Sequence, residues 1–199
     1  MRYFVTAIGT DSGKTIASAI LCEALGADYW KPIQSGTPRD TDTVRALVTR
    51  SDIVMHPERY FLQIPASPHA AARAEGIDID INDFTIPDGP RPLVIEGAGG
   101  IMVPINDSLL MIDLVKRTEA EIVVVSNHYL GSINHTLLTA EAINRRCLPV
   151  KGIIFNGNRN EETEKIILRH TGWSQLLQIE QEKKIDKEII CKYAQQLRL

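Results

Sequence analysis

The part of the chain that most constrains its fold is residues 2–25, which combine a strand, a glycine-containing turn and a helix. Residues 2–8 are aromatic, β-branched and almost continuously apolar, which predicts a buried β-strand. Residues 16–25 predict a helix that Gly26 ends in the usual C-terminal position. Between them, residues 9–15 read Gly-Thr-Asp-Ser-Gly-Lys-Thr. A strand and a helix around a turn that ends in Gly-Lys-Thr are the context that a phosphate-binding P-loop requires.

In such a loop, backbone N–H groups of the turn and of the helix N-terminus point at phosphate oxygens. Lys14 adds a cation toward the β- and γ-phosphates, and the Thr15 hydroxyl can hold Mg²⁺. The usual motif has a glycine at the position that Ile8 occupies here, so the spacing is not standard. We interpret the loop as a variant P-loop with one extra residue. The alternative is a chance Gly-Lys-Thr at the start of an ordinary helix.

Two further charged residues stand at the ends of predicted strands. Lys31 follows the short strand 27–30, and Glu96 closes the apolar strand 91–96, just before the glycine-rich turn 97–100. Ligands of open α/β sheets bind at the carboxyl ends of the strands. P-loop proteins place an acidic residue at such a strand end to hold the Mg²⁺ shell, which is the role we predict for Glu96. Asp40 and Asp42 precede or open a helix that ends near Thr49, and either could cap it or reach a metal held by Thr15.

The rest of the chain alternates strands and helices. Helices are predicted over 67–75, 109–118, 132–146, 161–170 and 186–197, and strands over 121–127, 150–157 and 176–179; residues 51–66 are predicted to be irregular. This alternation predicts an α/β fold, a doubly wound and mostly parallel sheet of the P-loop NTPase type. Gly131 and Ser132 leave the N-terminus of one helix open to an anion.

Composition excludes some classes of partner. The 199 residues carry a net charge of -3 and no strongly basic stretch, which argues against nucleic acid. No apolar run approaches the roughly 20 residues of a membrane span. The chain opens directly on a strand and P-loop, so we expect no signal peptide. Three widely spaced cysteines predict reduced thiols in a cytoplasmic protein.

Taken together, these motifs resemble those of the dethiobiotin synthetase family of the biotin pathway, over essentially the whole chain. The segments that carry the resemblance are Phe4-Val5-Thr6 with the loop 9–15, Lys31-Pro32 with Ser35-Gly36, Thr41-Asp42, Ser67-Pro68-His69, residues 94–100 and residues 130–135. The family's loop also has one extra residue, and its first glycine falls on Ala7, where this chain departs from the pattern.

The resemblance implies one P-loop NTPase-like domain over residues 1–199. It implies an enzyme that uses ATP and Mg²⁺ to close a ureido ring on 7,8-diaminononanoate and CO₂, within a homodimer whose sites lie at the subunit interface.

The resemblance also implies residue roles. Lys31 and Lys14 would be catalytic, and Thr15, Glu96 and Asp42 (rather than Asp40) would hold the metal. Substrate contacts would come from Thr10, Ser35, Gly131 and Asn134. The nucleotide would be bound by Asp11, Ser12, Gly13, Lys14, Thr15, Ile16, Asp42, Glu96, Gly97, Ala98, Gly99 and Asn156, the last of which would read adenine.

Two other classes compete with this interpretation. Partitioning-type ATPase switches share a related P-loop, but they carry a signature lysine four residues before the Gly of Gly-Lys-Thr, where this chain has Gly9. A non-catalytic nucleotide-binding module is the third class, and ATP turnover that depends on the diamine and bicarbonate separates all three.

Overall fold

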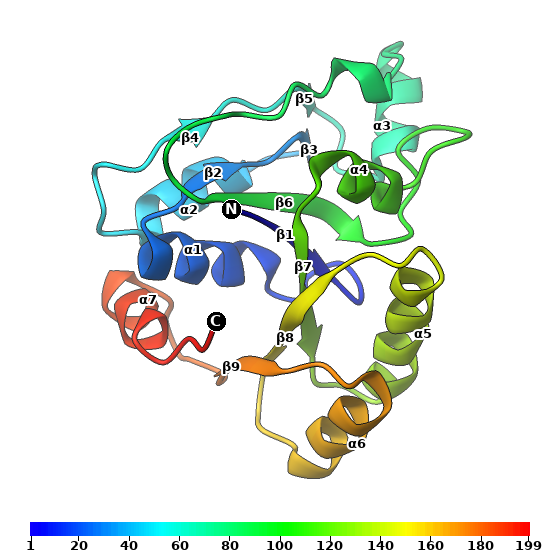
Figure 1. The fold of residues 1–199 in the computed structure, drawn as a ribbon. Helices are drawn as coiled ribbons and strands as arrows, with labels where there is room; N and C mark the ends of the chain where they lie inside the picture. Colours follow the sequence, from blue (N-terminus) through cyan, green and yellow to red (C-terminus); the bar gives the residue numbers. More distant parts are fainter.

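The computed structural model describes residues 1–199 and has a seven-stranded sheet at its centre (Figure 1). In spatial order the strands are β4 (Met55–His56), β2 (Asp28–Trp30), β6 (Leu93–Gly100), β1 (Arg2–Ala7), β7 (Glu121–Asn127), β8 (Val150–Asn156) and β9 (Gln175–Ile179). Every neighbouring pair is parallel. The predicted α/β fold with a parallel, doubly wound sheet is therefore confirmed.

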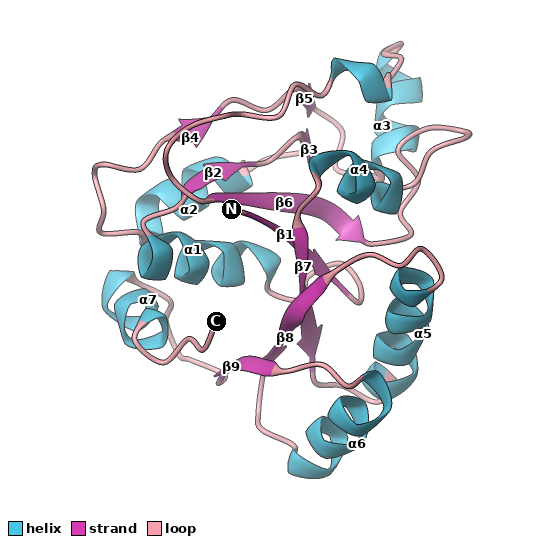
Figure 2. Ribbon diagram, in the orientation of Figure 1, coloured by secondary structure: helices cyan, strands magenta, loops and turns pink.

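Helices cover both faces of this sheet, as Figure 2 shows in cyan against the magenta strands. They are α1 (Lys14–Leu25), α2 (Asp40–Leu47), α3 (Pro68–Glu75), α4 (Met111–Thr118), α5 (Ser132–Asn144), α6 (Glu161–Thr171) and α7 (Lys187–Ala194). Helices α1, α2 and α7 pack on one face, and α4, α5 and α6 contribute to the core on the other. None of the helices has both the length and the apolar character needed to cross a membrane.

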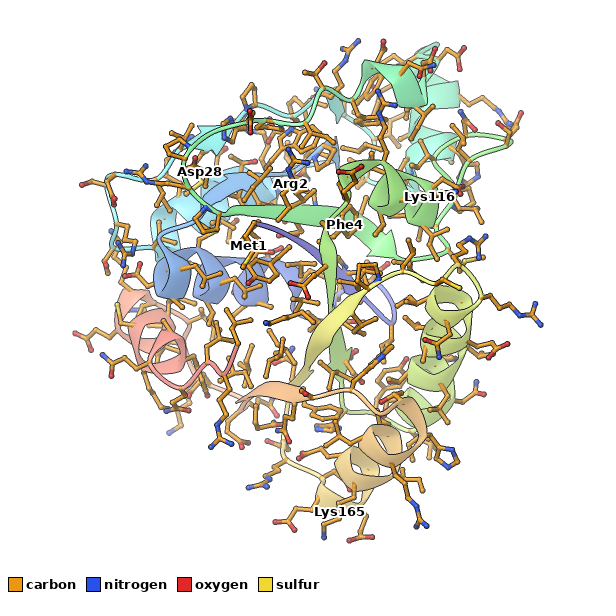
Figure 3. The ribbon with its side chains drawn as sticks, viewed as in Figure 1. Met1, Arg2, Phe4, Asp28, Lys116 and Lys165 are labelled. Atoms are coloured by element: carbon orange, nitrogen blue, oxygen red, sulfur yellow. The ribbon has the colours of Figure 1, made fainter.

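Alternation along the strands sends each side chain to one of these two cores. Phe4, Trp30 and Ile95 lie in the core beneath α4, whereas Val5, Tyr29 and Val94 lie in the core beneath α1. Figure 3 shows the contrast between buried and exposed side chains: Phe4 is enclosed near the middle of the sheet, and Lys165 projects from α6.

The structure corrects the predicted elements in three places. Residues 51–66 are not wholly irregular, because they contain β4 and β5 (Tyr60–Leu62), and β5 pairs with β3 (Ile33–Ser35) in a separate two-stranded sheet. Strand β6 does not end at Glu96 but continues to Gly100, with an irregularity in its pairing to β1. Neither Asp40 nor Asp42 caps α2, because Arg39 is the N-cap residue and both aspartates lie in the first turn of the helix.

Candidate functional site

A cavity of about 750 Å³ opens at the carboxyl ends of β1, β2 and β6. The loop after β1 forms one wall, Lys31 and the segment that leads to α2 form another, and Glu96 with the end of β6 forms its floor. Eleven of the twenty residues that line the cavity are polar or charged. This is the edge of the sheet where α/β proteins bind ligands, as the sequence predicted.

The loop 9–15 wraps around the N-terminus of α1. Gly13 is the N-cap residue and has φ +93°, in the left-handed region. This conformation favours glycine, and a Cβ at Gly13 would also lie 2.4 Å from the amide nitrogen of Asn156 and displace that side chain. The side chain of Asn156 donates a hydrogen bond to the backbone oxygen of Ser12 (2.9 Å) and so ties the end of β8 to the loop.

Lys14 lies across this loop and is nearly buried. Its ammonium donates one hydrogen bond, to the backbone oxygen of Gly9 at 3.3 Å. Burial lowers the pKa of Lys14 below its ordinary value; the carboxylate of Glu96 opposes that effect, and the positive charge of Lys31 adds to it. Its positive charge is thus only partly compensated within the protein, as suits a group that receives phosphate oxygens.

Lys31 is buried at the opposite wall, with acceptors for all three of its N–H groups. Its Nζ lies 2.5 Å from Asp40 Oδ2, 3.1 Å from Glu96 Oε1 and 3.4 Å from the backbone oxygen of Gly97. Burial acts to lower the pKa of Lys31, but the carboxylates of Glu96 and Asp40 outweigh it and raise the pKa above its ordinary value. The side chain is therefore a fixed cation.

Glu96 is the common acceptor of the site. The Thr15 hydroxyl donates to its Oε1 at 3.0 Å, and the Tyr29 hydroxyl donates to its Oε2, also at 3.0 Å. The side chain of Glu96 has no solvent exposure. Thr15 and Glu96, both predicted from the sequence, do converge, which makes them a pair of oxygen donors suited to a hard cation.

The structure does not bring the third predicted metal residue, Asp42, to the cavity that holds Thr15 and Glu96. Its carboxylate is 49% exposed and forms ion pairs with Arg39 (2.9 Å) and Arg45 (3.4 Å), outside the cavity. Asp40 lines the cavity instead, and its backbone N–H bonds to the Gln34 side chain at 3.1 Å. Residues two apart on a helix point about 200° apart around its axis, so only one of the two aspartates can face the cavity.

Most of the other predicted residues do line this cavity: Thr10, Asp11, Ser12, Gly13, Ile16, Ser35, Ala98 and Gly99. The Ser35 hydroxyl is buried and has no hydrogen-bond partner in the protein, which leaves it available to a ligand. Sequence reasoning assigned no role to Gln34 or Ser67, which also line the cavity. Ser67 stands in a segment that carries the resemblance, whereas Gln34 gave no signal.

Gly131 and Asn134 do not join this cavity. They lie at the N-terminus of α5, on a second cavity of about 890 Å³ that His128 and Arg159 also line. Several exposed apolar side chains surround it, among them Tyr129, Leu130 and Ile133. Within one chain, the predicted substrate contacts therefore fall into two separate places.

Because Lys31 compensates two carboxylates, we expect Lys31→Met to destabilise the protein by about 3 kcal/mol, as when one partner of a buried ion pair is removed. Adding Glu96→Gln should recover part of this loss, since it removes the charge left uncompensated. Chemical denaturation of the two variants measures both effects. A change within about 0.5 kcal/mol for Lys31→Met, typical of a surface site, would contradict the arrangement described.

Comparisons with known proteins identify the relatives of this chain. A family model described as an AAA domain matches residues 1–189. The ATP-dependent dethiobiotin synthetase BioD of Cytophaga hutchinsonii is 54% identical over 198 residues, which cover 98% of this chain and 96% of that protein. The protein of the same name from Christiangramia forsetii is 44% identical over 198 residues, with 98% and 95% covered.

Among solved structures, a ParA family ATPase from Chlorobium tepidum aligns with a TM-score of 0.58 at 11% identity, covering 98% of this chain and 97% of that one. The septum site-determining protein MinD of Pyrococcus horikoshii, complexed with Mg-ADP, aligns with a TM-score of 0.55 at 13% identity, with 98% and 88% covered. At such identities the likeness shows the fold alone. By its sequence relatives, the chain belongs to the ATP-dependent dethiobiotin synthetases, a family of enzymes.

Proposed function

We propose that this protein is an ATP- and Mg²⁺-dependent cyclo-ligase that converts 7,8-diaminononanoate and CO₂ to dethiobiotin, with release of ADP and phosphate, and that residues 1–199 form its one domain. The observation that carries the proposal is the pair of buried lysines, Lys14 and Lys31, which face one cavity beside Glu96. Relatives at 44–54% identity over nearly the whole chain support the choice of reaction.

The residues present fit a nucleoside triphosphate and a divalent cation. Gly13, in the left-handed conformation, caps the N-terminus of α1, and the free N–H groups of this helix end favour phosphate. Thr15, Asp40 and Glu96 supply hydroxyl and carboxylate oxygens, the ligands that Mg²⁺ prefers, so we propose them as the residues that hold it. When bound, Mg²⁺ would neutralise charge on the transferring phosphoryl group.

The reaction needs cations where anions form. One amine of the substrate adds to CO₂ and loses a proton, which gives a carbamate. Lys31 and Lys14 would stabilise this anion, because both are buried cations at the cavity wall. A carbamate oxygen then attacks the γ-phosphorus of ATP to give a carbamic–phosphoric anhydride and ADP, with Lys14 against the transferred group. The second amine attacks the carbonyl carbon and loses a proton, the bond from that carbon to the phosphate oxygen breaks, and the ring closes as phosphate leaves.

Positioning accounts for the remaining roles. We propose that Thr10 and the unpartnered hydroxyl of Ser35 hold the reacting end of the substrate. Asn156 would face the base: its amide N–H is committed to Ser12, which leaves its side-chain oxygen free to accept from the exocyclic amine of adenine.

The substrate's carboxylate tail would bind at the helix N-terminus of Gly131, with Asn134 as a side-chain donor. Because these residues lie on a different cavity from Lys31, we propose that a second copy of the chain brings them to the site in a homodimer. The exposed apolar residues around Leu130 support an interface at that place.

Product formation tests the function directly. The purified chain is incubated with ATP, Mg²⁺, 7,8-diaminononanoate and bicarbonate, and ADP and dethiobiotin are measured together. We expect equal amounts of both, and neither when the diamine or bicarbonate is omitted. ADP release at the same rate with and without the diamine would indicate a nucleotide switch, and ATP binding without any turnover would indicate a binding module.

The proposed metal set makes a prediction that separates two neighbouring aspartates. Asp40→Asn is expected to raise the Mg²⁺ concentration for half-maximal activity by about tenfold or more, because a ligand facing the cavity loses its charge. Asp42→Asn, the same change two residues along the same helix, should shift it by less than about twofold, since only exposed ion pairs are lost. The opposite order would show that α2 presents Asp42 to the metal.

Mixing two inactive variants tests the dimer. Lys31→Ala and Asn134→Ala each damage one half of the proposed site. In a mixed dimer one of the two sites would combine an intact Lys31 with the partner copy's intact Asn134. Mixing equal amounts, with exchange of subunits, should therefore restore about a quarter of wild-type activity. If both residues serve a site within one chain, every site in the mixture carries a lesion and no activity returns.

A further inference from the structure

Tyr29 is a buried polar side chain to which the mechanism assigns no role. It lies in the middle of β2, between Met55 of β4 and Val94 of β6, and has no solvent exposure. Its hydroxyl donates to Glu96 Oε2 at 3.0 Å. Burial raises the pKa of Tyr29 well above 10, and the charge of Glu96 raises it further, so the phenol stays neutral and keeps its proton to donate.

The register of the sheet explains why Tyr29 reaches this carboxylate. Tyr29 and Lys31 are two residues apart, and Val94 and Glu96 likewise, so all four point to the face covered by α1. On that face the two carboxylate oxygens of Glu96 accept hydrogen bonds from different donors. Oε1 accepts from Lys31 and Thr15, and Oε2 accepts from Tyr29.

We propose that Tyr29 is a positioning residue for the cation site: it holds Glu96 in the single orientation that turns Oε1 toward Thr15 and Lys31. The inference rests on the proposed function, which makes Glu96 a ligand of Mg²⁺. Without the phenol, Oε2 is a buried carboxylate oxygen without a donor. The carboxylate is then stabilised by a rotation that brings both of its oxygens toward Lys31. This rotation moves negative charge away from the site proposed for Mg²⁺.

A role in packing alone makes a different prediction. Phenylalanine fills the same space in the core beneath α1, so Tyr29→Phe removes the hydroxyl and little else. Tyr3→Phe is the matched control. Tyr3 lies on β1 in the same core and is also buried, but its hydroxyl points to the sulfur of Met1, away from the cavity.

The test is the Mg²⁺ dependence of ADP binding, measured by calorimetry without diamine or bicarbonate. Tyr29→Phe is expected to raise the Mg²⁺ concentration for half-saturation about tenfold, the usual scale for loss of an outer partner of a metal ligand. Tyr3→Phe should leave it unchanged, and ADP affinity without Mg²⁺ should be the same in all three proteins. Unchanged Mg²⁺ dependence in folded Tyr29→Phe, judged by its thermal unfolding, overturns the inference while leaving the proposed function intact.

A second comparison keeps the inference testable if Tyr29→Phe is unstable. Glu96→Gln replaces the charged carboxylate by a neutral amide, so there is no longer a charged oxygen for the Tyr29 hydroxyl to position. Adding Tyr29→Phe to this variant should therefore not change the Mg²⁺ dependence any further. An equal, additive shift in both backgrounds would mean that Tyr29 acts through general stability. If the ADP affinity of the wild-type protein does not depend on the Mg²⁺ concentration, both this inference and the proposed metal site are overturned.

Discussion

The ammonium group of Lys31 and the carboxylates of Asp40 and Glu96 require one another. Burying a lone ammonium or a lone carboxylate costs several kcal/mol, so Lys31 and Glu96 could not stand at this depth without each other, and the partly exposed carboxylate of Asp40 adds a second partner for Lys31. Each comes from a different element: Lys31 follows β2, Asp40 opens α2, and Glu96 lies within β6. Their mutual compensation fixes the segment between β2 and α2 against the centre of the sheet. The Gln34 side chain strengthens this link because it accepts the backbone N–H of Asp40.

The two lysines of the cavity stand in opposite electrostatic settings. Lys31 has acceptors for every N–H group, and its neighbours raise its pKa, so its charge is permanent and its place is fixed. Lys14 has one hydrogen bond, and burial lowers its pKa, so it gains most when an anion approaches. This difference suits the proposed chemistry, in which Lys14 meets the transferring phosphoryl group and Lys31 lies beside the carbamate. The protein therefore supplies one cation, Lys31, whose charge its own carboxylates compensate, and another, Lys14, whose charge is compensated when an anionic ligand binds.

Local patterns predicted the features that depend on local structure. The P-loop and Glu96 could be identified because a buried strand, a glycine turn and a helix each leave a local signature in the sequence. Asp40 and Asp42 could not be separated this way, since spacing does not say where a short helix begins or which way its first turn faces. Strands β3 and β5 are three residues long and show no periodicity, so sequence alone missed them. The separation of Gly131 from Lys31 follows from the order of the strands and the second cavity, which no local pattern encodes.

The central claim is that an oxygen of CO₂ attacks ATP before the ring closes, and the fate of that oxygen tests it. Freshly dissolved ¹⁸O-labelled bicarbonate is supplied with ATP and diamine for a short reaction, and the released phosphate is analysed by mass spectrometry. If the carbamate oxygen attacks the γ-phosphorus, that oxygen leaves with the phosphate, so each phosphate formed carries one oxygen from CO₂. Phosphate without label, formed together with dethiobiotin, would show that ATP is cleaved by water and would contradict the roles given to Lys14 and Lys31.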